Sequence, residues 1–414
     1  MTTEERLESN VRYYCRKFPA RFDRAKGCRL FAGDKSYLDF FSGAGALNYG
    51  HNNESIKQKI IEYVQNDGII QSLDLDTVAT ENFLRSFSEI VLQPRELDYK
   101  IMFCGPTGTN AVEAALKLAK KVTGRNGVVA FSGSFHGMTA GSMAVSWSRY
   151  KQLQGADFDV TFAPYPFSPD DASDSLGYLK NAFSDDKSGK QRPAAVILET
   201  VQAEGGVIVS DSKWLFDLAS LCKEYGVLLI VDDVQVGCGR TGNFFSFERA
   251  GIVPDIVALA KSIGGYGLPL SLLLFKPGCD LWRPGEHNGT FRATQLSVVA
   301  ATAALEYYKN DDLMKKVRED CLFIERFFDE EIAPVDPRIS RRGVGLIHGL
   351  DFSAVGEGVA ERVRAECFLR GLVIETSGRR SSVLKLLPPL VIEKEELRRG
   401  LTIIRDSIKQ ILIG

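Results

Sequence analysis

The chain has 414 residues, a length that fits one large α/β domain with additions or two to three ordinary domains. Its 51 basic and 53 acidic side chains nearly cancel, which argues against a protein that binds nucleic acid or an acidic membrane through its overall charge. With 44% hydrophobic residues, 25% charged residues and 38 glycines, the composition is typical of a folded globular protein with many tight turns.

The N-terminal segment, MTTEERLESNVRYYCRKF, is polar and has no apolar core of the kind that a signal peptide needs. No window approaches the roughly 18 apolar residues of a membrane helix. We therefore expect a cytoplasmic protein. The eight cysteines form no C-x-x-C pair and there are only four histidines, so the sequence predicts neither a disulfide framework nor a metal site.

Short apolar runs alternate with longer stretches of helical spacing, such as residues 110–122 and 211–225. The runs are continuously apolar, which is typical of strands covered on both faces in a mainly parallel sheet. The pattern therefore favours a doubly wound α/β layer. Seven strands are predicted in chain order, at residues 100–104, 127–131, 160–163, 194–199, 227–231, 256–260 and 270–275.

After residue 296 the pattern changes to long helical stretches, which reach residue 309 and then cover 311–331. Strands are predicted at 343–352, 372–375 and 383–387, and a closing helix from Glu393. This part indicates a small α+β domain. The expected division is an N-terminal segment (1–53) docked on the small domain, a large domain (54–305) and the small domain (306–414). The polar stretch 184–192 is expected to be a mobile loop.

A glycine-rich turn, Gly105-Pro-Thr-Gly-Thr-Asn110, follows the first of these strands and opens a helical stretch. Such a turn presents free backbone N–H groups and the positive end of the helix dipole, with a threonine hydroxyl beside them. It therefore suits a phosphate. The turn lacks the Gly-Lys-Ser/Thr ending of a P-loop. Alone, it also fits an ordinary N-cap.

Two adjacent carboxylates, Asp232 and Asp233, end the most apolar of the strands, at the edge where α/β sheets bind ligands. A buried carboxylate needs a cationic partner there, because otherwise its pKa rises and it becomes neutral. The glycines that follow, Gly237, Gly239 and Gly242, have G-x-G-x-x-G spacing. They do not directly follow the strand and no amphipathic helix begins after them, so a nicotinamide site is the weaker interpretation.

Lys261 ends another apolar run and precedes a glycine-rich turn. A lysine amine held among apolar neighbours becomes a nucleophile that can form a Schiff base with an aldehyde, although a strand-end lysine can also simply reach solvent. The glycine-rich turn, Asp232 and Lys261 together are the anchors that pyridoxal phosphate needs for its phosphate, its ring nitrogen and its aldehyde. The combination predicts this cofactor, with the lysine also moving a proton.

Further motifs resemble those of the class III pyridoxal-phosphate aminotransferases of fold type I, through nearly the whole chain. They are Gly108-Thr109, Phe135-His136-Gly137, Glu199-x-x-Gln-x-Glu204-Gly-Gly, Asp232-Asp-Val-Gln-x-Gly-x-Gly-Arg-Thr-Gly242, Lys261 and Gly289-Thr290. Within the family, residues 14–19, 39–52, 105–113 and 284–292 resemble the diaminobutyrate–2-oxoglutarate subgroup of ectoine biosynthesis. The resemblance implies a large domain, whose mainly parallel seven-stranded sheet lies between helices, and a small α+β domain.

Carried over position by position, the resemblance implies that Lys261 is the Schiff-base lysine and Asp232 the partner of the ring nitrogen, both catalytic. The phosphate would be held by Gly108, Thr109 and Thr290, the last from the neighbouring subunit, which implies a homodimer with a shared active site and leaves a tetramer open. The other expected cofactor-binding residues are Phe135 on the ring face, Gln235 near the phenolic oxygen, His136 and Glu199.

The expected substrate-binding residues are Glu204 and Lys385. In family members that act on ornithine or 4-aminobutyrate, the matching glutamate pairs with an arginine that gates between the amine substrate and 2-oxoglutarate. Lys385 can form this ion pair but not the bidentate clamp that arginine places on a carboxylate. The diaminobutyrate subgroup also has lysine here, so the departure favours that subgroup. It leaves open which residue binds the carboxylates of glutamate.

The resemblance implies reversible transfer of the terminal amino group between L-2,4-diaminobutyrate and 2-oxoglutarate, giving aspartate 4-semialdehyde and glutamate. Alternatives within the fold are another ω-aminotransferase, for ornithine, 4-aminobutyrate or a specialised-metabolite aldehyde, and an aminomutase or epimerase. Alternatives outside it are a nicotinamide-dependent dehydrogenase and a non-catalytic binding protein. The expected partners are small amino acids and 2-oxo acids, without nucleic acid, membrane or metal.

Overall fold

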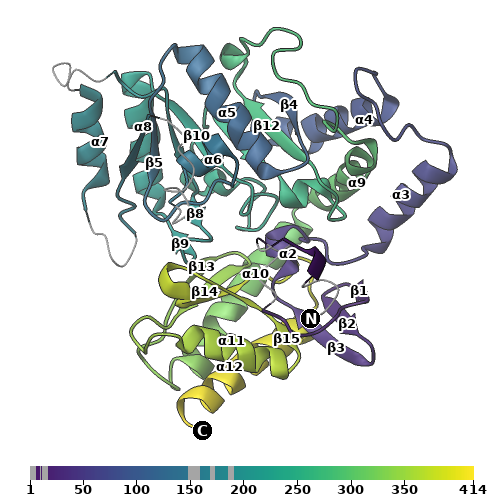
Figure 1. Cartoon of the computed structure of the whole chain (residues 1–414), viewed down its shortest axis with the longest axis vertical. Coiled ribbons are helices and arrows are strands. Elements are labelled where there is room, and N and C mark those ends of the chain that lie inside the picture. Colours follow the sequence, from purple (N-terminus) through teal and green to yellow (C-terminus); the bar gives the residue numbers. More distant parts are fainter. Residues whose placement is uncertain (1–5, 10, 12–16, 148–158, 168–172, 185–190) are drawn as a thin grey trace.

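The computed structural model describes residues 6–9, 11, 17–147, 159–167, 173–184 and 191–414. Two lobes lie one above the other in Figure 1, and the C-terminus belongs to the lower one. We call the upper part the large lobe and the lower part the small lobe. Most of the stretch 184–192 and the first residues of the motif at 14–19 lie outside the described residues.

The large lobe is built on a seven-stranded sheet with the strand order β4-β12-β11-β10-β7-β5-β6. Only β12 runs antiparallel to its neighbours, and the remaining pairs are parallel. The mainly parallel sheet predicted from the sequence is therefore confirmed. Its strands are β4 (Lys100–Gly105), β5 (Val128–Phe131), β6 (Val160–Ala163), β7 (Ala195–Leu198), β10 (Leu228–Asp232), β11 (Ile256–Leu259) and β12 (Ser271–Phe275).

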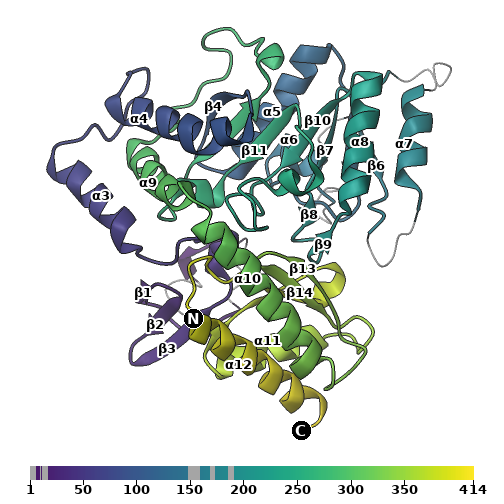
Figure 2. The same ribbon diagram turned by 180° about the vertical axis from the view of Figure 1, so that it is seen from behind.

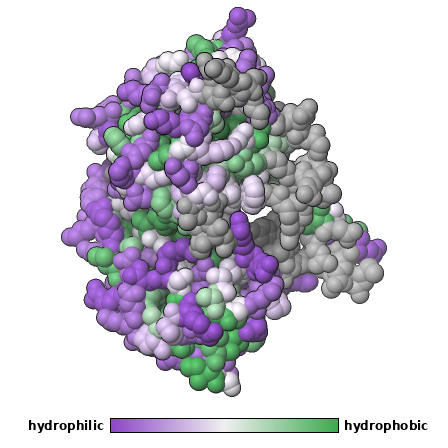
Figure 3. All heavy atoms as spheres, turned by 90° about the vertical axis from the view of Figure 1, so that its left-hand side faces the viewer, coloured by the Kyte–Doolittle hydropathy of each residue, from purple (hydrophilic) through white to green (hydrophobic). Residues whose placement is uncertain are grey.

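Helices cover both faces of this sheet. α5 (Gly108–Thr123) lies in front of the sheet in Figure 1, and α8 (Ser212–Tyr225) lies in front in the reverse view of Figure 2. In β10, Ile230 packs into the apolar cluster around α5, whereas Leu229 and Val231 pack into the cluster that contains α8. Two-sided burial explains why the strands are continuously apolar. Figure 3 views the molecule from the side of α8, where the described surface is mainly hydrophilic with interspersed apolar residues.

The small lobe contains an antiparallel sheet of order β13-β14-β17-β16 with helices packed on it. The stretch 343–352, expected to be one strand, is instead part of a hairpin that turns at Gly345. The left-handed φ of +57° at that glycine permits the turn. The elements are α10 (Asp312–Phe327), β13 (Ser340–Val344), β14 (Ile347–Asp351), α11 (Val359–Leu369), β16 (Glu375–Ser377), β17 (Val383–Leu386) and α12 (Lys394–Leu412).

The N-terminal segment joins the small lobe through a second sheet. Its strands β1 (Arg24–Lys26), β2 (Arg29–Ala32) and β3 (Lys35–Asp39) form a meander, and β3 pairs in parallel with β15 (Leu372–Val373). Residues from both ends of the chain thus share one sheet. In the described part of the chain, no helix is long and apolar enough to cross a membrane.

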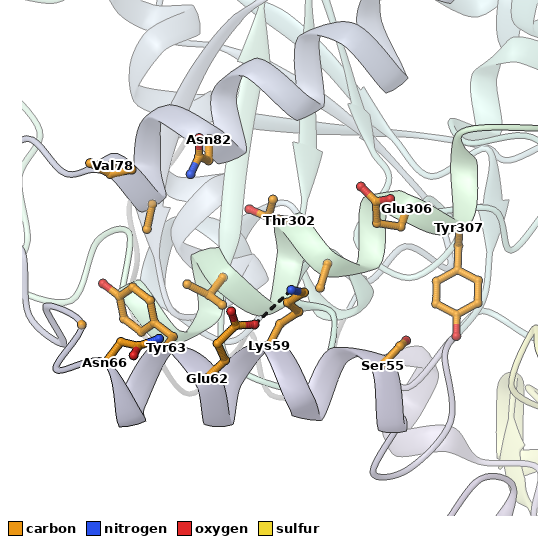
Figure 4. Close-up of a pocket in the computed structure, with 14 residues that line it drawn as sticks. Ser55, Lys59, Glu62, Tyr63, Asn66, Val78, Asn82, Thr302, Glu306 and Tyr307 are labelled. Atoms are coloured by element: carbon orange, nitrogen blue, oxygen red, sulfur yellow. Dashed lines mark hydrogen bonds and ion pairs between the residues drawn. The ribbon is translucent and has the colours of Figure 1, made fainter.

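Three helices at the side of the large lobe, α3 (Glu54–Gln65), α4 (Val78–Phe87) and α9 (Gln295–Leu305), surround a pocket of about 760 Å³ (Figure 4). Its walls carry one ion pair, with Lys59 Nζ 3.0 Å from Glu62 Oε2. The ends of the parallel strands do not line this pocket. The chemistry predicted from the sequence therefore has to be sought in a smaller pocket, at the strand ends.

Candidate active site

The carboxyl ends of the parallel strands meet at one edge of the large sheet, where a pocket of about 150 Å³ lies. Nine of the residues predicted from the sequence line this pocket together: Gly108, Thr109, Phe135, His136, Glu199, Glu204, Asp232, Gln235 and Lys261. Gly137 and Val234 complete the lining. Of the other two predicted residues, Lys385 lies directly behind Glu204, and Thr290 is exposed outside the lining.

Asp232 is the last residue of β10, and its carboxylate contacts His136. His136 Nδ1 lies 2.6 Å from Asp232 Oδ2, and the N–H of Val234 donates to Asp232 Oδ1 at 3.1 Å. Burial disfavours the charged imidazolium, yet the hydrogen bond and the charge of Asp232 outweigh burial and raise the pKa of His136. The imidazole thus orients the Asp232 carboxylate in the pocket wall.

Glu199 directly follows β7 and holds the backbone of the next pocket segment. Its Oε1 accepts the N–H of Phe135 at 2.9 Å, and its Oε2 accepts the N–H of Ala203 at 3.4 Å. Burial raises the pKa of Glu199 to about 7, against the opposing charge of His136. Phe135 itself keeps 41% of its surface exposed. Its ring is therefore free to cover a flat ligand at the pocket.

The N-terminus of α5 approaches the end of β10 closely. A Cβ at Gly108 would lie only 2.8 Å from a methyl carbon of Val234, so a side chain there would push the helix away from the strand. The helix is capped by Thr107 and Asn110, with the N–H of Thr107 donating to Asn110 Oδ1 at 3.1 Å. The glycine thus lets the positive end of a 16-residue helix dipole reach the pocket.

Three hydroxyl groups gather beside this helix end. Thr109 Oγ1 lies 2.6 Å from Ser142 Oγ and 2.7 Å from Thr139 Oγ1. Gly137 passes over them with a left-handed φ of +128°, and a Cβ there would lie 2.7 Å from Ser142 Oγ. Together with the helix N-terminus, these hydroxyls form a cradle that suits a phosphate. Sequence analysis did not identify Thr139 or Ser142, because neither belongs to the glycine-rich turn.

Lys261 follows β11 and begins a short 3₁₀ turn (Lys261–Gly264). Its φ of 53° is left-handed, an uncommon conformation for a residue with a side chain and one that is found at functional sites. Burial lowers the pKa of its ammonium, an effect that Glu204 opposes and Lys385 reinforces. A lysine with a lowered pKa more readily supplies the unprotonated amine that acts as a nucleophile.

A second cluster of charge lies on the far side of Lys261. Lys385 of β17 is fully buried, with its Nζ 2.5 Å from Glu204 Oε1 and 3.2 Å from Glu375 Oε2. Burial opposes its charge, but both carboxylates outweigh burial and raise the pKa of Lys385. Glu204 also accepts a hydrogen bond from Gln235 Nε2 at 3.3 Å. Sequence analysis missed Glu375, whose one signal is a carboxylate at the end of the apolar run 372–374.

The pocket residues fit pyridoxal phosphate. The hydroxyl cradle suits its phosphate, the Asp232 carboxylate suits a protonated ring nitrogen, and the Lys261 amine suits its aldehyde. One orphan atom supports the fit: Gln235 Oε1 is buried at the pocket and has no hydrogen-bond partner among the residues that the structure describes. A ligand hydroxyl at this position would satisfy it.

Comparisons with known proteins agree with this geometry. The family model described as Aminotransferase class-III matches residues 13–408. The chain is similar to the diaminobutyrate–2-oxoglutarate transaminase of Halalkalibacterium halodurans, with 49% identity over 100% of this chain and 97% of that protein. It is also similar to the enzyme of the same name from Streptomyces anulatus, with 50% identity over 98% and 97% of the two chains.

Solved structures show the same fold. The ornithine aminotransferase of Toxoplasma gondii superposes with a TM-score of 0.87 at 24% identity, over 99% of this chain and 94% of that chain. A transaminase from the marine bacterium Virgibacillus superposes with a TM-score of 0.83 at 18% identity, over 95% and 93% of the two chains. At these identities, the superpositions establish the architecture of the two lobes.

Proposed function

Since the chain belongs to the class-III aminotransferase family and is a pyridoxal-phosphate-dependent transaminase, we propose a specific reaction for it. In this reaction, the terminal amino group of L-2,4-diaminobutyrate is transferred to 2-oxoglutarate. The observation that carries the proposal is the ion pair of Glu204 with a fully buried Lys385 beside Lys261. The pair places the Glu204 carboxylate at the pocket wall, held there by a buried ammonium, where it can bind the ammonium at the unreacting end of the substrate. The relatives named above, at 49% and 50% identity, support the same substrate.

Pyridoxal phosphate, when bound, supplies an aldehyde that takes up the substrate amine and a ring that accepts electrons from the reacting carbon. In the proposed assignment, Gly108 and Thr109 hold the phosphate at the N-terminus of α5. Asp232 would bind the ring nitrogen and keep it protonated, while His136 fixes the carboxylate through the contact of its Nδ1. Further contacts come from Phe135 on the ring face, Gln235 at the phenolic oxygen and Glu199 beneath the Phe135 backbone.

Lys261 has two tasks in this proposal. Its amine would hold the cofactor in the resting protein, and with a substrate bound it would move a proton at the reacting carbon. The pocket wall supports both tasks, because burial lowers the pKa of Lys261 while the nearby Glu204 limits the shift. A base whose pKa lies closer to the working pH transfers protons in both directions more efficiently.

The far end of the pocket suits diaminobutyrate. When its terminal amine reacts, the other end of the molecule carries an ammonium and a carboxylate on one carbon. Glu204, whose side chain is 33% exposed, is placed to accept the ammonium, and the fully buried Lys385 holds Glu204 in place from behind. 4-Aminobutyrate, which has no such ammonium, leaves Glu204 without this contact.

We also infer a homodimer in which the partner subunit's Thr290 completes the phosphate site. Within its own chain Thr290 is exposed and does not line the pocket. A patch of exposed apolar residues beside the 760 Å³ pocket gives a second copy a surface to cover: Ile69, Ile70, Leu73, Leu75 and Val78.

The proposed division into residues 1–53, 54–305 and 306–414 is supported by the shared sheet of β3 and β15.

A substrate series tests the reaction. Purified protein is supplied with 2-oxoglutarate and one amine at a time, and glutamate formation is measured. The amines are diaminobutyrate, ornithine, 4-aminobutyrate and lysine. We expect the highest kcat/KM for diaminobutyrate, with no product when 2-oxoglutarate is left out. A higher kcat/KM for another amine would show that the proposed substrate is wrong. Product formed without 2-oxoglutarate would indicate an aminomutase or epimerase instead.

Mixed dimers test the shared site. Thr290→Ala and Lys261→Ala proteins are each expected to be impaired, and mixing them under conditions of subunit exchange should create one site that carries neither change. Random pairing makes half of the dimers mixed, each with one intact site of two, so activity should recover to about a quarter of the wild-type level. A monomer in sedimentation equilibrium, or no recovery on mixing, would contradict the shared site.

A further inference from the structure

Lys385 is shared between two carboxylates that come from different parts of the fold. Glu375 stands directly opposite Lys385 in the antiparallel pair of β16 and β17, so the sheet itself fixes their distance. Glu204 comes from the turn between β8 (Val201–Gln202) and β9 (Ile208–Val209). The Nζ atom lies 3.2 Å from Glu375 and 2.5 Å from Glu204.

The cluster itself holds two carboxylates and one ammonium, and the cation that faces it from the pocket is Lys261, whose charge favours the ionised form of both carboxylates. In the part of the chain that the structure describes, neither carboxylate forms an ion pair with an arginine. Burial raises the pKa of Glu375, with Lys385 opposing and Glu204 adding to the effect. Among the described residues, the partner of Glu375 Oε2 is Lys385 Nζ, 3.2 Å away. A further cation near the cluster would relieve the repulsion between the two carboxylates.

The three side chains lie in a fixed order from the pocket inwards. Glu204 lines the pocket and is 33% exposed, Lys385 is fully buried behind it, and Glu375 does not reach the lining. A substrate therefore meets Glu204 first. Glu375 therefore acts on the substrate through Lys385, by changing the strength of the ion pair between Lys385 and Glu204.

We propose that Glu375 is a positioning residue for substrate selection, which shares the Lys385 ammonium and so leaves Glu204 free to bind a second ammonium group on the substrate. The inference rests on the proposed function, because diaminobutyrate is the substrate with such a group. Without the Glu375 charge, Lys385 would neutralise Glu204 alone, and the attraction for a substrate cation would fall.

Two substrates isolate this effect, because 4-aminobutyrate is diaminobutyrate without the α-amino group. The experiment measures kcat/KM for both amines in the wild-type holoenzyme, Glu375→Gln, Glu375→Asp and a control, Glu366→Gln. Glu366 pairs with Arg370 on the surface of α11, with 2.8 Å between Glu366 Oε1 and Arg370 Nε, away from the pocket. In Glu375→Gln we expect the preference for diaminobutyrate to fall roughly tenfold, through KM rather than kcat. Glu375→Asp should restore part of it.

A spectroscopic measurement adds a readout that needs no substrate. The groups that face Lys261 are Glu204, Lys385, Asp232 and Glu199, and Glu375 acts on Lys261 from behind them. Removing the Glu375 charge should move the pH midpoint of the cofactor absorbance change in the resting holoenzyme to lower pH, because a positive charge near Lys261 becomes less favourable. Glu366→Gln should leave it in place.

The outcomes separate the two proposals. If the wild-type protein shows no preference for diaminobutyrate over 4-aminobutyrate, the proposed substrate is wrong and the role of Glu375 falls with it. If the wild-type preference exists but Glu375→Gln preserves it, or loses activity equally with both amines, only the role of Glu375 is overturned. A midpoint that does not move would overturn the shared charge directly.

Discussion

Two clusters of buried charge flank Lys261, and the fold builds them differently. Asp232, His136 and Glu199 follow neighbouring strands of a single sheet, so their distances are set within the large lobe. Glu204 and its partners Lys385 and Glu375 join a turn of the large lobe to two strands of the small lobe. The first arrangement suits a cofactor that is always the same, whereas the second can adapt to two different substrates.

The largest effect is expected within the first cluster, where two adjacent carboxylates have different partners. Asp232→Asn should lower kcat/KM by roughly 10³-fold, because a neutral amide cannot keep the ring nitrogen protonated. Asp233→Asn should leave turnover nearly intact and cost about 1 kcal/mol of stability, because Asp233 instead accepts the N–H of Ser246 at 2.9 Å. Steady-state kinetics and urea unfolding measure the two quantities.

Comparing the two variants also shows which results would contradict the assignment. If Asp233→Asn loses as much activity as Asp232→Asn, the assignment of the ring-nitrogen partner is wrong. Equal loss of stability without loss of activity in both variants would mean that the cluster serves folding alone.

The next effect concerns the second cluster and its single cation. Lys385→Met should lower the free energy of unfolding by about 3 kcal/mol near neutral pH, because two partly buried carboxylates would face each other without the cation between them. Lys385→Arg keeps the charge and serves as the matched variant. Urea unfolding of the apo-protein gives the values. Wild-type stability in Lys385→Met would show that the cluster is solvated and not a buried ion triad.

A smaller, pH-dependent effect is expected at Glu199. Its pKa is raised from 4.5 to about 7 by burial, so the folded protein holds this proton more tightly than the unfolded chain does. The associated stability is present in full below the unfolded pKa and is lost as the pH rises through the folded pKa. Glu199→Gln lacks this dependence, so it should gain about 1–3 kcal/mol relative to wild type between these pH values. A constant difference across the window would contradict the shift.

The sequence predicted the first cluster more completely than the second. Seven apolar runs became the seven strands of the large sheet, and Asp232 and Lys261 follow two of them. Strand ends are readable because burial on both faces leaves a long apolar signal and parallel strands end at one edge. The first cluster could be predicted from strand ends alone, because all of its residues belong to the large lobe and the position of the small lobe does not affect them.

The parts that escaped prediction depend on contacts between distant segments. Glu375 contacts Lys385 because β16 and β17 pair with these two residues opposite each other. The local sequence pattern does not predict that register. Ser142 reaches Thr109 across 33 positions of sequence, through the turn at Gly137. The stretch 343–352, predicted as one strand, contains the turn at Gly345 that joins β13 to β14, because that glycine interrupts an otherwise strand-like pattern. Local signals thus identify elements and their ends, but not long-range pairs.

The central claim is that the strand-end pocket holds pyridoxal phosphate on Lys261. Borohydride reduction of the purified yellow holoenzyme, followed by peptide mass mapping, tests it most directly. The account predicts a pyridoxyl-phosphate mass addition on the peptide that contains Lys261, and its loss in Lys261→Ala protein. A label on another lysine, or an unlabelled Lys261 peptide in protein that still transaminates, would contradict the account.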